Sequence, residues 1–155
     1  MKKKKNSDPV HAWLVLYRAV QAMSQYAASE IHMDGIGVSD FRVLEVLLHK
    51  GPQAVNAIGP KVHLNPGAIS VAVDRLYKKG LVTREESGED RRVRNVALTE
   101  AGRNLIVPIF EHHTQTVRTM FSELTAQEVE LLETLMRRLG MRAKSLATAH
   151  EMAIK

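Results

Sequence analysis

Apolar residues recur every three or four positions through most of this 155-residue chain. That spacing places them on one face of an α-helix. Only one part of the chain departs from it, where two short runs rich in β-favouring residues flank a polar turn. The sequence therefore predicts a mainly α fold with a small β-wing. We expect the helices to cover six ranges: 9–33, 39–50, 54–62, 66–79, 100–124 and a last one from 126 onward. Ser39 is expected to cap the second of these helices, and Thr125 with Glu128 to form a capping box at the start of the last one.

The stretch from 65 to 99 carries the most specific pattern. Asn65 is a favourable N-cap residue, and Pro66 suits the first helical position, where no backbone N–H is needed. Apolar residues at Ile69, Val73 and Leu76 form one stripe, and the helix is expected to end before Gly80. Two strand-like runs then follow, 81–84 and 93–98, joined by a turn-rich segment containing two arginines. A helix followed directly by a basic hairpin predicts a winged helix-turn-helix.

The side of this helix opposite the apolar stripe, which we call the outer face, has a composition suited to DNA. Val71 lies nearly opposite the stripe, where its methyl groups could contact a thymine methyl. Neighbouring polar and basic side chains could bond to bases or phosphates. A surface helix with one stray valine is the alternative, and the basic hairpin attached to the helix favours DNA. The outer face comprises Gly67, Ser70, Val71, Asp74, Arg75 and Lys78.

Several short motifs in this region occur in a fixed order. They are an L-x-x-K-G helix end at 76–80, a strand ending in Arg84, a D-x-R turn at 90–92, and L-T-x-x-G at 98–102. Together they resemble the signature of the MarR family of bacterial transcription regulators. More loosely, the resemblance covers nearly the whole chain, because the family also has helices on both sides of this module. The resemblance implies that Arg92 enters a DNA minor groove while Asp90 shapes the wing. An arginine suits a narrow, electronegative minor groove.

The predicted DNA-binding set joins these wing residues to the helix. It comprises Asn65, Pro66, Gly67, Ser70, Val71, Asp74, Arg75, Lys78, Arg84, Asp90, Arg91 and Arg92.

The last helix carries a second apolar pattern that the winged module does not need. Apolar residues there step by 3, 4, 3, 4 and 3, a heptad spacing typical of helices that pack against partners. We call this set the seam: Val129, Leu132, Met136, Leu139, Ala143 and Leu146. The long first helix adds further apolar surface. We therefore expect a homodimer, which in this family reads a pseudo-palindromic DNA operator.

These patterns divide the chain into four parts. Residues 1–8 are expected to be a basic disordered tail, and residues 9–37 an N-terminal helix for dimerisation. Residues 38–99 form the winged helix-turn-helix region, and residues 100–155 the C-terminal dimerisation helices. The formal charge of +5 is concentrated in the tail, at Lys2–Lys5, and in residues 61–98, where eight basic residues outnumber five acidic ones. A solvated arm is the usual role of such a lysine tail, and extra phosphate contacts are the alternative.

Other classes of protein find little support in the sequence. No cysteine is present, so disulfides and thiol chemistry are excluded. The chain contains none of the usual nucleophile-elbow, phosphate-loop, dinucleotide or zinc-protease motifs. No apolar run approaches a membrane span, and the N-terminus lacks a secretory pattern. We expect a cytoplasmic protein that is not an enzyme and has no cofactor, no metal and no membrane partner.

Two alternatives stay open. One is a helical dimer that binds a metal or a small molecule and has no role on DNA, with the adjacent His112 and His113 as the best metal candidates. The other is an enzyme that uses the scattered histidines. Neither alternative explains the paired arginines of the predicted wing.

The family resemblance also implies a ligand-responsive repressor. Its members typically bind small aromatic or phenolic molecules between the dimerisation helices and the winged domain. Parts of the sequence, AWLVLYRAVQAM among them, resemble the quinone- and phenol-responsive branch. Plain core packing is the competing interpretation of every aromatic residue involved. The predicted effector-binding residues are Trp13, Tyr17, His32, Phe41, Phe110 and His113.

Overall fold

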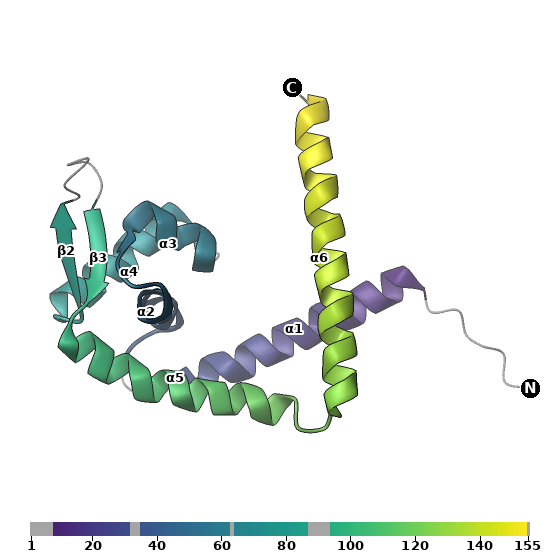
Figure 1. Ribbon diagram of the computed structural model, residues 1–155, viewed down its shortest axis with the longest axis horizontal. Coiled ribbons are helices and arrows are strands. Elements are labelled where there is room, and N and C mark those ends of the chain that lie inside the picture. Colours follow the sequence, from purple (N-terminus) through teal and green to yellow (C-terminus); the bar gives the residue numbers. More distant parts are fainter. Residues whose placement is uncertain (1–7, 32–34, 63, 87–93, 155) are drawn as a thin grey trace, which may run out of the picture. The chain divides into compact units, whose positions relative to one another are not determined.

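The computed structural model describes residues 8–31, 35–62, 64–86 and 94–154. Within these ranges the chain is mainly helical with one small sheet (Figure 1), so the predicted fold class is confirmed. The chain divides into two compact units, 1–117 and 118–155. The elements are α1 (Pro9–Ile31), α2 (Val38–Lys50), β1 (Gln53–Ala54), α3 (Val55–Val62), α4 (Pro66–Lys78), β2 (Val82–Glu86), β3 (Arg94–Leu98), α5 (Glu100–Met120) and α6 (Ala126–Ile154).

The sheet has three antiparallel strands in the order β1-β3-β2. Strands β2 and β3 form the predicted hairpin, with Val82 opposite Leu98 and Arg84 opposite Val96. Strand β1 was not predicted. The sequence interpretation placed Ala54 in a helix, but Ala54 pairs with Asn95 and the helix begins one residue later. This short strand attaches the hairpin to the start of α3.

The hydrophobic core lies within the winged module. It is built mainly from α2, α3, α4 and the sheet, and Leu44, Ile58, Leu76 and Val96 are fully buried there. Ile106 closes the core from α5. The buried stripe of α4 therefore faces α2 and α3, as its spacing predicted.

The ends of the helices agree with local sequence signals in most cases. The side chain of Asn65 accepts a hydrogen bond from the Ala68 N–H at 2.8 Å, which confirms the predicted cap of α4. Gly80 adopts a φ of 69°, a conformation that glycine reaches without strain. The predicted Ser39 cap of α2 is wrong, because Gly37 occupies that position and its N–H donates to the Asp40 carboxylate at 3.3 Å.

The L-T-x-x-G motif closes the junction between α4 and β2. Thr99 donates from its hydroxyl to the Gly80 carbonyl at 2.7 Å and from its N–H to the Leu81 carbonyl at 3.1 Å. The next turn of α5 packs so closely that a Cβ added at Gly102 would lie 1.9 Å from the Leu81 oxygen. Only glycine fits at that distance, so the motif fixes the angle at which the chain leaves the wing.

Two of the helices predicted to dimerise, α1 and α6, differ from the core elements in exposure. In α1 the large apolar side chains are mostly exposed, with Trp13 at 62% and Tyr17 at 51%. In α6 no residue is buried at all, and the seam residue Leu139 is 56% exposed. No helix in the described ranges has both the length and the apolar character to cross a membrane.

Candidate nucleic-acid interface

The α4 helix presents two chemically different sides. Ile69, Val73 and Leu76 are at most 1% exposed and hold one side against the core. The opposite side is open, and Val71 there is 58% exposed. Because the apolar stripe fixes the rotation of the helix, the outer face has a single orientation. Its exposed residues Gly67, Val71 and Lys78 lie where a double helix could reach them.

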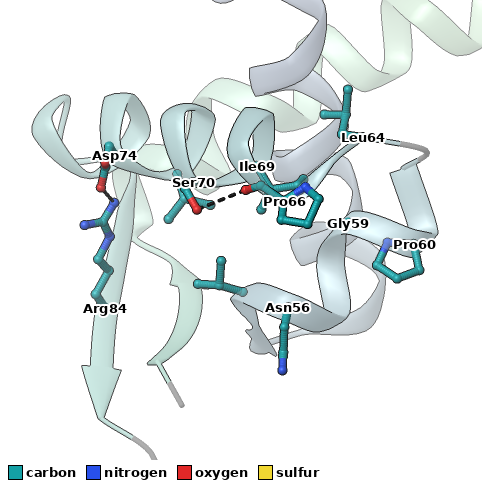
Figure 2. Close-up of a pocket in the computed structure, with 11 residues that line it drawn as sticks. Asn56, Gly59, Pro60, Leu64, Pro66, Ile69, Ser70, Asp74 and Arg84 are labelled. Carbon is teal, nitrogen blue, oxygen red and sulfur yellow. Dashed lines mark hydrogen bonds and ion pairs between the residues drawn. The ribbon is translucent and has the colours of Figure 1, made fainter. Parts of the chain in front are cut away.

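The N-terminal end of α4 supplies backbone donors. The first turn of a helix has unsatisfied N–H groups and a positive dipole end, which together attract phosphate. Asn65 satisfies only one of these donors. Gly67 is exposed, and a Cβ there would approach only the Asn65 side chain, at 3.5 Å. Ser70 lies one turn on, and its hydroxyl donates back to the Pro66 carbonyl at 3.0 Å (Figure 2).

A groove of about 560 Å³ lies beside this end of the helix, between α3, α4 and β2 (Figure 2). Its apolar walls come from both helices, and polar groups stand at its edge. The residues lining it are Val55, Asn56, Gly59, Pro60, Leu64, Pro66, Ile69, Ser70, Val73, Asp74 and Arg84. The groove thus joins the outer face of α4 to the first strand of the hairpin.

Two of the predicted DNA-binding residues bind one another. Arg84 on β2 forms an ion pair with Asp74 on α4, as Figure 2 shows. Its guanidinium also lies 4.9 Å from the centre of the Tyr77 ring, a cation–π distance. The pair fixes the strand against the helix and neutralises a carboxylate that would otherwise repel phosphate. Tyr77 was absent from the predicted set.

Arg75, another predicted DNA-binding residue, is bonded to the neighbouring helix α2. Its guanidinium donates to both Asp40 oxygens, at 2.6–3.0 Å, and to the Ser39 hydroxyl at 3.1 Å. This hydrogen bonding to Asp40 raises the pKa of Arg75, so the arginine stays charged. Since Asp40 is only 1% exposed, we interpret Arg75 as a brace between α4 and α2. The Arg75 side chain is still 41% exposed, and its contact with DNA stays a prediction.

A second side-chain hydrogen bond joins the end of α4 to the segment near the start of α2. The Lys79 ammonium donates to the Gly35 carbonyl, just before α2, at 2.7 Å. Both contacts join the end of α4 to the segment that follows α1. The pairing of Asp40 with Arg75 was missed from the sequence, where 35 positions separate the two residues.

The remaining predicted DNA-binding residues fall into two groups. Lys78 is exposed on the last turn of α4, as expected for a phosphate contact. Asp90, Arg91 and Arg92 lie outside the described residues. Their roles in the wing stay predictions from the family resemblance.

The predicted effector residues do not form a single cluster in the structure. Trp13 and Tyr17 stack with ring centres 6.2 Å apart on the exposed side of α1. Phe41 is buried and packs against His113 at 4.9 Å. Phe110 packs against His49 at 4.6 Å. His32 lies outside the described residues.

The adjacent histidines of α5 serve separate contacts. His112 binds Glu30 of α1 at 3.0 Å, whereas the Nδ1 atom of His113 is buried without a hydrogen-bond partner in the described structure. Among residues 8–31, 35–62, 64–86 and 94–154, no three histidine, cysteine or carboxylate side chains come together as metal ligands would.

Comparison with known proteins places these features in a family. The MarR family model matches residues 37–93, which run from the start of α2 to just before β3. The HTH-type transcriptional regulator MhqR of Bacillus subtilis is 38% identical over 132 residues, covering 85% of this chain and 91% of the relative.

Solved structures agree with this match. A probable transcriptional regulator from Pseudomonas aeruginosa is 29% identical, with a TM-score of 0.68 over 81% of this chain and 93% of its own. BpsR of Bordetella bronchiseptica, whose DNA binding is regulated by 6-hydroxynicotinic acid, shares the fold with a TM-score of 0.69 and 19% identity, covering 81% of this chain and 98% of its own.

Proposed function

This chain is a DNA-binding transcriptional regulator of the MarR family, and we propose that it acts as a homodimeric repressor released by a small aromatic ligand. The observation that carries the proposal is the open outer face of α4, held outward by a buried stripe and followed directly by the β2–β3 hairpin. Its relatives are transcription regulators and not enzymes. A metal- or ligand-binding dimer without a DNA role is therefore not favoured.

We assign the DNA contacts to two elements. The outer face of α4 would enter the major groove, with Ser70 and Val71 at the base edges and Lys78 at a phosphate. The segment between β2 and β3 would bring Arg91 and Arg92 to the neighbouring minor groove. The pairing of Arg84 with Asp74 supports this assignment, because it fixes the hairpin beside the helix. Such a protein would work where its operator is, in the cytoplasm.

We assign dimerisation to α1 and α6. Each helix carries apolar side chains that the described chain leaves exposed. Exposed apolar surface of this extent usually marks an interaction site. A second copy of the same chain offers the same helices. A two-fold dimer then presents two recognition helices, the α4 helix of each copy, to a pseudo-palindromic operator.

We assign the ligand site to the aromatic groups near α1, α2 and α5. Trp13 and Tyr17 offer flat, exposed rings, while Phe41, Phe110 and His113 lie between α2 and α5. A ligand held there would release DNA only by binding better to the conformation that misplaces the recognition helices. The sequence resemblance to the quinone- and phenol-responsive branch indicates which compounds to try first.

The DNA assignment is tested by one pair of variants on an operator recovered by genomic pull-down. Arg92→Ala should weaken operator binding by about 1–3 kcal/mol and reduce the salt dependence of the affinity. Arg142→Ala removes the same charge from an exposed position on α6 and should leave both unchanged. Equal behaviour of the two variants, or an affinity of the unmodified protein that ignores salt, would contradict the wing assignment.

The ligand assignment is tested through Trp13, the only tryptophan of the chain. Phenol, benzoate or benzoquinone should change its emission and weaken operator binding. Operator DNA should weaken binding of the same compound by an equal factor, because linkage between two ligands is reciprocal. If none of these compounds changes either signal, the aromatic effector class is rejected. Metal titration of variants at His112 and His113 is then the next experiment.

A further inference from the structure

A second cavity lies away from the recognition helix, between α2 and α3, which pack against each other (Figure 1). It measures about 540 Å³. Its apolar wall is aliphatic, from Val46 and the buried Val62. Charged and polar groups stand around that wall. The full lining is Arg42, Glu45, Val46, His49, Lys50, Lys61 and Val62.

The charges around this cavity do not cancel. Arg42, Lys50 and Lys61 supply three positive charges, and Glu45 supplies one negative charge. Both α2 and α3 also end here, at Lys50 and Val62. A helix C-terminus carries roughly half a negative charge, so the two ends offset about one further cation. A net charge of about +1 is left, even with His49 neutral.

Hydrogen bonds within the protein occupy only some of the N–H donors of these cationic side chains. Arg42 donates through one terminal nitrogen to the Val62 carbonyl at 3.4 Å. Lys61 bonds to the Gln53 side chain, and Gln53 in turn donates to the Lys50 carbonyl at 3.2 Å. The carbonyl of Lys50 at the end of α2 therefore accepts its hydrogen bond from a neutral amide and not from a cation. The Lys50 and Lys61 side chains remain exposed.

We propose that this cavity binds a small organic monoanion, a carboxylate on a short aliphatic body. The carboxylate would neutralise the net charge of the cationic rim, and the hydrocarbon would cover Val46 and Val62. The lining shares no residue with the DNA-binding set or with the predicted aromatic effector residues. The cavity does adjoin the predicted effector residues, because its His49 packs against Phe110, and the proposal does not rest on the function proposed above.

Hexanoate is the probe, and amide chemical shifts of the full-length protein are the readout. Hexanoate should shift the amides of Arg42, Val46, Lys50, Lys61 and Val62, and leave the Trp13 indole signal unchanged. Hexanol, which has the same body without the charge, should shift them at least tenfold less at equal concentration. Inorganic phosphate, which has charge without a body, should also bind at least tenfold more weakly. If either compound matches hexanoate, or if the shifts centre on α1, the proposal is overturned.

Matched variants separate a built site from the overall charge of the protein. Lys61→Gln should weaken hexanoate binding roughly three- to tenfold, as expected for losing one partly exposed charged contact. Lys144→Gln on the exposed surface of α6 makes the same change of net charge and should have no effect. Lys50→Gln serves as a second variant if Lys61→Gln alters the spectrum of the free protein. Equal weakening by the α6 variant, or no weakening by either cavity variant, refutes the assignment.

Discussion

The helices α4 and α6 share one sequence pattern and differ in its outcome. Both place apolar residues three and four positions apart. In α4 the stripe Ile69, Val73 and Leu76 is at most 1% exposed, because α2 and α3 cover it. In α6 no residue is buried, and Leu139 and Leu146 are more than half exposed. Periodicity therefore predicts a helix and its apolar side, but it does not say which chain covers that side.

The difference lies in which other elements each compact unit contains to cover the apolar side of its helix. The unit 1–117 contains enough elements to bury one stripe of α4 completely. The unit 118–155 contains the last residues of α5, a short turn and α6, so it has no second complete helix to cover the seam. An apolar surface of this length is costly to leave in water. We therefore attribute the core to folding of one chain and the seam to association of two.

The largest expected effect is the loss of the dimer on placing a charge in the seam. Leu139→Asp should dissociate the protein, since leaving an unpaired charge in a buried contact costs about 3–5 kcal/mol. In a two-fold dimer both chains carry the substitution, so the interface contains two such charges. Sedimentation velocity measures the result. Thr134→Asp, on the opposite side of α6, adds the same charge and should leave the dimer intact. A monomeric unmodified protein, or a dimeric Leu139 variant, would contradict the assignment of the seam to an interface between two chains.

The second effect is confined to the core. Leu76→Ala should lower the free energy of unfolding by about 2–5 kcal/mol, because it leaves a cavity between α4 and α2. Urea denaturation at fixed chain concentration measures this loss. Val71→Ala, on the exposed side of the same helix, should change stability by less than about 0.5 kcal/mol. Similar losses for the two variants would mean that α4 is covered on both sides.

The features that the sequence predicted well are those set by neighbouring residues. Asn65 caps α4 through an N–H three positions along, and Gly80 ends the same region with a positive φ. Thr125 and Glu128 form the predicted reciprocal cap of α6, at 2.8 and 3.3 Å. In each case the interacting groups lie within one helical turn. The residue types alone therefore decide the geometry.

The features that were missed depend on contacts between distant parts of the chain. Strand β1 has only two residues and exists because β3 pairs with it. Arg75 looked like a DNA contact because it lies on the side of the helix away from the stripe. No pattern in the sequence indicated that the packing of α4 on α2 also brings it to Asp40. The cap of α2 is Gly37 and not Ser39, and the Ser39 hydroxyl accepts a hydrogen bond from Arg75 instead.

The smallest expected effect concerns the caps that begin the two helices. The α4 cap uses the uncharged Asn65, whereas the α6 cap uses Glu128, whose carboxylate accepts from the Thr125 N–H and hydroxyl at 2.8 Å each. These bonds, the backbone one foremost, hold the pKa of Glu128 below its ordinary value of 4.5. A lowered pKa in the folded state means stabilisation above pH 4.5 that is lost as the pH falls through the folded value.

We therefore expect the first turn of α6 to fray in mild acid while the first turn of α4 does not. The protection of the Glu128 and Ala68 amides against hydrogen exchange, relative to an unfolded chain at the same pH, is measured from pH 6 down to about pH 3. It follows the two caps in one sample. Glu128→Gln should remove the pH dependence at α6, because its amide cannot titrate, and should leave Ala68 unaffected. A Glu128 carboxyl that titrates at or above 4.5, or equal acid sensitivity at both caps, would show that the α6 cap does not depend on this charge.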